Sequence, residues 1–140
     1  MSRSSFIEIN GHKIELFLST WGMSRICEMI GGELSELSVW LGECSSVERV
    51  ERFSKILAIL ANGAIMQKNT DIEYGFEQGE KRPLFKEDFF IYAANAADIA
   101  KYQEEIFTAI SMGLNYTVPE GVEVEAKDPD LAELEREKNQ

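Results

Sequence analysis

The stretch from Phe6 to Leu18, with the sequence FIEINGHKIELFL, decides the beginning of the fold. Its central pair, Asn10-Gly11, is favoured in a two-residue type I′ turn because both turn residues need a positive φ. Apolar and polar residues alternate on either side of this pair, and that period of two is typical of a β-strand. We therefore predict a β-hairpin around residues 10–11.

The register of this hairpin follows by counting outward from the turn. Ile7 then lies opposite Ile14, and Glu8 lies opposite Lys13 as an oppositely charged pair. One face of the hairpin carries five apolar side chains, namely Ile7, Ile9, Ile14, Leu16 and Leu18. Because a two-stranded ribbon is not stable alone, we expect this face to pack on helices.

Apolar residues at a spacing of three and four predict helices after the hairpin. The predicted helices span residues 20–30, 33–41, 46–67, 85–94 and 96–113. Thr20 is the expected N-cap of the first helix, and Asn95 is the expected N-cap of the last, which we expect to end at a Gly113 C-cap. The segment from Ile72 to Tyr74 predicts a short additional strand beside the hairpin.

The longest predicted helix begins with a capping box formed by Ser45 and Glu48. Its apolar stripe holds Val47, Val50, Phe53, Leu57, Leu60 and Ala64, and is widened by Ile56, Ile59 and Ile65. A helix with apolar residues on most sides lies in the centre of a core or is covered by a partner. This helix is therefore a candidate for both roles.

The fold class that these elements predict is α+β and mostly α. We expect one domain over residues 1–118, in which the N-terminal hairpin packs on a bundle of about five helices. Residues 119–140 differ in composition, with eight Asp and Glu against three Lys and Arg, a net charge of −5 within a chain total of −11. They contain no aromatic residue, so we expect a disordered acidic tail.

The acidic composition restricts the partners. A pI near 4.6 argues against binding nucleic acid or an anionic membrane, because both kinds of binding depend on Lys and Arg. The longest apolar run, residues 56–66, is too short to cross a bilayer. No secretory signal of the usual form is seen, so we expect a cytoplasmic protein.

Residues that could carry chemistry are few. The single histidine, His12, flanks the hairpin turn, and Cys27 and Cys44 do not form a CxxC pair. No glycine loop for a nucleotide and no spacing typical of a metal site is present. We therefore expect no enzyme activity, no catalytic residue, no metal and no cofactor.

Aromatic residues crowd the predicted helix at 85–94, and core filling is their simplest role. The alternative is that part of this apolar surface stays exposed between acidic residues, which is typical of a partner site. The residues that we predict to contact a partner are Phe53, Ile56, Ile59, Leu60, Phe85, Phe89 and Phe90.

The order of these elements resembles tail assembly chaperones of long-tailed bacteriophages and prophages of Gram-positive hosts. The similarity lies in the opening hairpin with the helix that ends at Gly31-Gly32, in the segment 52–64 as a central helix, and in residues 87–113 as closing helices. It covers residues 6–113 and rests on layout. It implies a protein of the host bacterial cytoplasm that binds the tape measure protein, or another tail protein, and keeps it soluble.

Two other functions fit an acidic binding protein: a cytoplasmic regulatory adaptor, and a DNA mimic that inhibits a DNA-binding protein. A mimic predicts dense carboxylates on the folded body, whereas the acidic residues here concentrate in residues 119–140. The sequence is compatible with a homo-oligomer, and the resemblance implies that a frameshift-extended form can exist.

Overall fold

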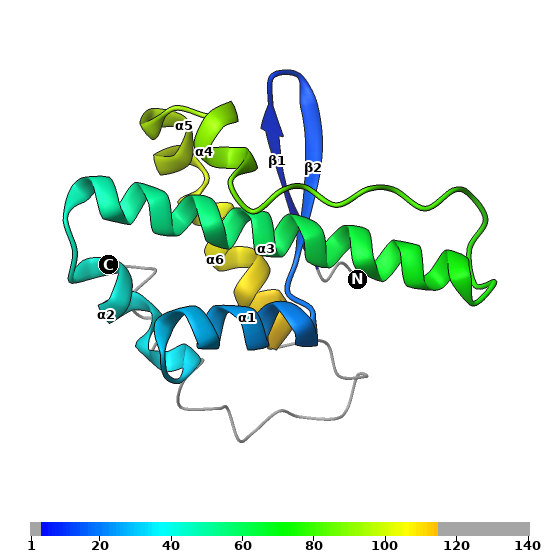
Figure 1. Ribbon diagram of the computed structural model, residues 1–140, viewed down its shortest axis with the longest axis horizontal. Helices are drawn as coiled ribbons and strands as arrows, with labels where there is room; N and C mark the ends of the chain where they lie inside the picture. The colour runs from blue at the N-terminus through cyan, green and yellow to red at the C-terminus, as the bar shows by residue number, and fades with distance from the viewer. Residues whose placement is uncertain (1–3, 115–140) are drawn as a thin grey trace, which may run out of the picture.

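The computed structural model describes residues 4–114 and has the predicted α+β, mostly α fold (Figure 1). Its elements are β1 (Ser4–Ile9), β2 (His12–Phe17), α1 (Thr20–Ile30), a 3₁₀ turn η1 (Leu34–Glu36), α2 (Leu37–Gly42), α3 (Ser46–Glu73), α4 (Phe89–Ala93), α5 (Ala96–Lys101) and α6 (Gln103–Leu114). The domain boundary predicted at residue 118 and the acidic segment 119–140 lie outside the described residues.

The hairpin of β1 and β2 has the predicted register, with Ile7 opposite Ile14 and Glu8 opposite Lys13. Asn10 and Gly11 have φ values of 50° and 82°, as a type I′ turn requires. The five apolar side chains of the predicted inner face are all buried. Local sequence chemistry is therefore sufficient to specify this element.

Helix α3 is the centre of the molecule and crosses its whole length (Figure 1). It contacts β2 and each of the other five α-helices of the described chain, while α6 also packs on β1. The Ser45–Glu48 capping box is present as predicted. Val47, which we expected on the inner stripe, is 70% exposed because it lies in the first turn, outside the packed part of the helix.

Two glycines allow α3 and α6 to lie directly against the chain that leaves β2. A Cβ atom on Gly63 would stand 2.5 Å from the carbonyl oxygen of Phe17, and one on Gly113 would stand 2.6 Å from Cβ of Leu18. Because α6 continues to Leu114, Gly113 lies inside the helix and is not the predicted C-cap. Its role is the close contact with Leu18, where only a residue without a side chain fits.

Helix α3 extends further than residue 67 because no glycine or proline interrupts the chain until Gly75, whose φ is 80°. Residues 72–73 are consequently helical, and the strand predicted from Ile72 to Tyr74 is wrong.

The N-cap of α1 is Ser19 and not Thr20, since the Ser19 hydroxyl accepts a 3.0 Å hydrogen bond from the Gly22 N–H.

The remaining helices are shorter than predicted. The segment 33–41 divides into η1 and α2, and only Phe89–Ala93 of the predicted helix 85–94 is helical. Asn95 caps α5 as expected, but the closing helix breaks at Tyr102 into α5 and α6. The Tyr102 hydroxyl donates to the Glu8 carbonyl oxygen at 2.8 Å, which ties this break to β1.

Candidate partner-binding groove

The seven residues predicted to contact a partner come together in space, but mainly inside the protein. Helix α3 is enclosed by β2 and the other helices, which use most of its wide apolar surface. Four of the seven side chains are buried, namely Phe53, Ile56, Leu60 and Phe90. Ile59, Phe85 and Phe89 are partly exposed. In this conformation only these last three can contact another molecule.

The aromatic residues around α4 fill the core beside α3. The ring centroids of Phe85 and Phe89 are 4.6 Å apart, and those of Phe89 and Phe90 are 4.9 Å apart with nearly perpendicular planes. Such contacts stabilise aromatic clusters beyond their burial. Core filling is thus the main role of this cluster in the fold.

Residues 74–88, here called the strap, return along α3 without regular structure (Figure 1). The Asn62 Nδ2 donates to the Phe85 carbonyl oxygen at 2.9 Å, and the Phe85 N–H donates to Asn62 Oδ1 at 2.8 Å. Asn69 makes the same pair of bonds, at 2.9 and 2.8 Å, with the main chain of Arg82.

The two asparagines match the strap in spacing. Seven helical residues rise by about 10.5 Å, and three extended residues cover about 10 Å, so each amide meets a main-chain pair of the strap. This double clamp positions the end of the strap, including Glu87, beside α1 and α3.

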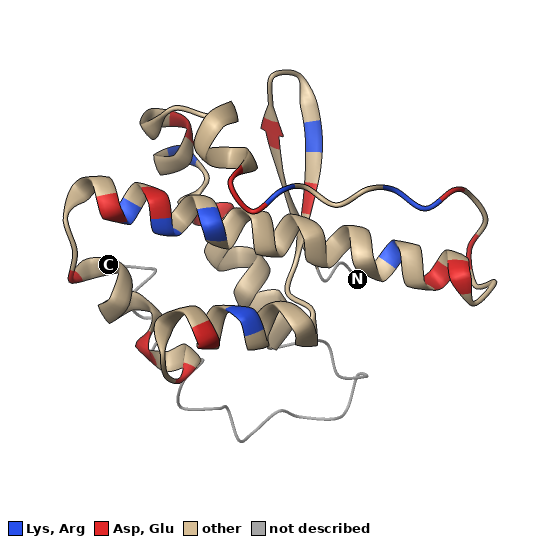
Figure 2. Ribbon diagram, in the orientation of Figure 1, with Lys and Arg blue, Asp and Glu red and all other residues tan. Residues whose placement is uncertain are grey.

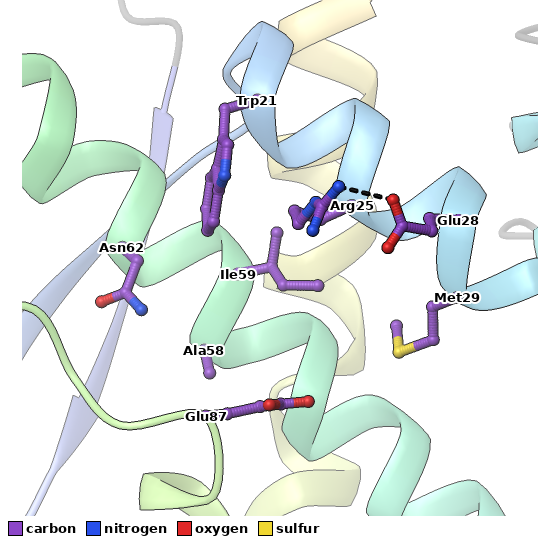
Figure 3. A pocket seen from close by; sticks show the side chains of 8 residues that line it. All are labelled: Trp21, Arg25, Glu28, Met29, Ala58, Ile59, Asn62 and Glu87. Carbon is purple, nitrogen blue, oxygen red and sulfur yellow. Dashed lines mark hydrogen bonds and ion pairs between the residues drawn. The ribbon is translucent and has the colours of Figure 1, made fainter.

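A groove of about 470 Å³ opens where α1, α3 and the strap meet (Figure 3). It is lined by Trp21, Arg25, Glu28 and Met29 of α1, by Ala58, Ile59 and Asn62 of α3, and by Glu87 of the strap. The two helices approach closely beside it at Gly22, where an added Cβ atom would stand 3.4 Å from Cγ2 of Ile59.

The α1 side of the groove is a helical stripe with one exposed aromatic residue. Trp21, Arg25 and Met29 follow one another at intervals of four, so they share a side of α1. The indole of Trp21 projects from α1 toward α3 and remains 38% exposed (Figure 3). Trp21 is not among the seven residues that the sequence predicts to contact a partner, although its interval of four from Arg25 indicates a second face of α1.

Charge is distributed unevenly around the groove. Arg25 Nη2 forms a 2.5 Å ion pair with Glu28 Oε2 on α1. Glu87 enters from the opposite side, and within residues 4–114 no cation lies at ion-pair distance from it. The groove therefore carries one uncompensated negative charge at its rim (Figure 3).

Other exposed apolar residues lie away from the groove. Tyr74 and Phe76 stack at the end of α3, with ring centroids 6.5 Å apart, and Phe76 is 82% exposed. A second hollow of about 660 Å³ shares Trp21 with the groove and lies between the β2–α1 link, α3 and the end of α6. Trp21 thus lines both hollows.

The residues considered for chemistry are dispersed. His12 is exposed beside the hairpin turn, and Cys27 and Cys44 are half-buried free thiols. Burial, with a smaller contribution from the Glu33 carboxylate, raises the pKa of the Cys27 thiol. In the described part of the chain, no group of three His, Cys, Asp or Glu side chains is placed to hold a metal ion.

Comparisons of the chain with protein-family models, with curated proteins and with solved structures gave no match. Among residues 4–114, no helix combines the length and the apolar character needed to cross a membrane. By its own geometry, the chain is a small α+β protein with a groove between two helices.

Proposed function

We propose that this protein is a bacteriophage tail assembly chaperone, which binds the tape measure protein in the host bacterial cytoplasm and keeps it soluble during tail assembly. The observation that carries the proposal is the groove between α1 and α3, where Trp21 and Ile59 remain partly uncovered beside charged residues. The order of the elements, from the hairpin to the closing helices, supports the same assignment.

The physical reasoning concerns exposed apolar surface. A long helical protein that waits for its assembly partners exposes apolar surface and aggregates readily. A small protein with a helix-sized groove can cover part of that surface. A net charge of −11 then adds charge repulsion between complexes, which favours solubility.

The charge distribution of the folded body weighs against the DNA-mimic alternative. Residues 4–114 carry ten Lys and Arg against 17 Asp and Glu, a net charge of −7. Figure 2 shows positive and negative residues interspersed along the helices, whereas a mimic needs rows of carboxylates. Removal of residues 119–140 separates the two functions, because a mimic should lose its target and a chaperone should keep its client.

The test is co-expression with the tape measure protein of the same phage or prophage. We expect the soluble fraction of the tape measure protein to rise, and the two proteins to elute together from a gel-filtration column. The control is co-expression with an unrelated acidic protein of similar size, which should give no rise. Equal solubility with and without this chain would refute the proposal.

A further inference from the structure

We infer that the groove between α1 and α3 takes a short apolar helix of the client that carries a Lys or Arg beside its apolar stripe. The identity of this client rests on the function proposed above. The shape of the bound segment and its charge follow from residues of the groove itself.

The length of the groove indicates a helix of about two turns. Trp21 and Met29 mark its α1 side and are eight residues apart, a rise of about 12 Å. A helix that binds in a groove uses anchor residues at positions i, i+3 or i+4, and i+7, which span a similar distance. Ala58 and Ile59 supply the apolar wall on the α3 side.

The rim of the groove selects the charge of the bound helix. Arg25 is already paired with Glu28, so it offers little attraction to a further carboxylate. Glu87, on the facing rim, has no cation among the described residues, and the exposed Asp88 follows it. A Lys or Arg on the bound helix would complement these carboxylates, whereas an Asp or Glu would be repelled.

Net charge disfavours a second copy of this chain as the occupant. The carboxylates beside its exposed aromatic pair, Tyr74 and Phe76, are already paired with Lys81 and Lys68. Residues 4–114 of each copy nevertheless carry a net charge of −7, so two copies repel each other. A basic, apolar helix of a different protein fits better.

The experiment uses two synthetic 16-residue peptides with Leu at helical anchor positions. One peptide carries Lys beside the Leu stripe, and the other carries Glu at the same positions. Binding of each labelled peptide to the full chain is measured by fluorescence anisotropy, with wild-type protein, Trp21→Ala, Glu87→Lys and Glu80→Lys. Glu80→Lys is the matched control, because Glu80 is an exposed strap residue that does not line the groove.

We expect wild-type protein to prefer the Lys peptide. Glu87→Lys should lower the affinity for this peptide by about 3- to 10-fold and raise the affinity for the Glu peptide. Glu80→Lys should change the affinity for each peptide by less than about 2-fold. Trp21→Ala should lower the affinity for the Lys peptide by about 5-fold or more, since it removes the aromatic anchor. Circular dichroism confirms that each variant is folded, as expected for partly or fully exposed positions.

Three results would overturn the inference. The first is an equal loss of affinity for the Lys peptide in Glu87→Lys and Glu80→Lys, and the second is no loss of this affinity in Trp21→Ala. The third is a homodimer of the wild-type chain that Trp21→Ala dissociates. The co-expression assay, repeated with Trp21→Ala and Glu87→Lys, separates this inference from the proposed function. If wild type and variants solubilise the tape measure protein equally, the groove assignment fails and the function stands. If wild type gives no solubility gain but the peptides show the expected charge preference, the function fails and the groove assignment stands.

Discussion

Replacing Asn62 by alanine tests the clamp between α3 and the strap. The Asn62 side chain is 8% exposed, and its amide satisfies both the N–H and the carbonyl oxygen of Phe85. The alanine variant removes two hydrogen bonds, each with a net contribution of about 1 kcal/mol, and leaves two partly buried main-chain groups without that partner. We therefore expect the free energy of unfolding to fall by about 2–4 kcal/mol.

Asn69→Ala is the matched control, because Asn69 makes the same two bonds with Arg82 at an exposed site. Water replaces exposed hydrogen bonds, so we expect this variant to lose less than about 1 kcal/mol. Urea denaturation measures both free energies, and the midpoint of Asn62→Ala should be lower than wild type by about 1 M or more. Trypsin cleavage after Lys81 should become faster in Asn69→Ala, since the strap is released locally. Equal losses of stability in the two variants would refute the reasoning.

Two further predictions concern stability. Gly63→Ala should lower the free energy of unfolding by about 1–3 kcal/mol, because the new Cβ meets the Phe17 carbonyl oxygen, whereas Gly42→Ala, with open space around it, should lack this loss in the same urea titration. Because burial raises the pKa of the Cys27 thiol, the folded protein holds that proton more tightly than the unfolded chain. The stabilisation from this protonated thiol is complete below the pKa of the thiol in the unfolded chain and is lost as pH rises above about 8.5. The urea midpoint of Cys27→Ser should therefore fall less between neutral and alkaline buffer than the midpoint of wild type. An equal fall in the two proteins would contradict the assignment.

The parts of the fold that could be predicted from sequence are those fixed by near neighbours in the chain. The Asn10-Gly11 turn sets the register of the hairpin, and the Ser45–Glu48 box sets the start of α3. Both depend on residues within a few positions of one another. The end of α3 was missed, because polar residues after 67 suggested a loop although Gly75 is the first residue that stops the helix.

The candidate site depends on contacts between distant residues, and local patterns do not contain this information. The strap is extended because Asn62 binds the main chain of Phe85, 23 positions later, and an asparagine within a helix does not signal such a bond. The groove likewise combines Trp21 with Glu87. Sequence periodicity identified the buried stripe of α3 except for Val47, but most of its residues face the core.

The contact between β1 and α6 has a consequence for synthesis on the ribosome. The Ser5 hydroxyl donates to the Glu105 carbonyl oxygen at 2.7 Å, so the first strand is joined to the last described helix. At about 5–20 residues per second, translation takes roughly 5–20 s to proceed from the hairpin to α6. During that interval the nascent hairpin lacks the packing of α6, so part of its apolar face is open to aggregation until α6 is made.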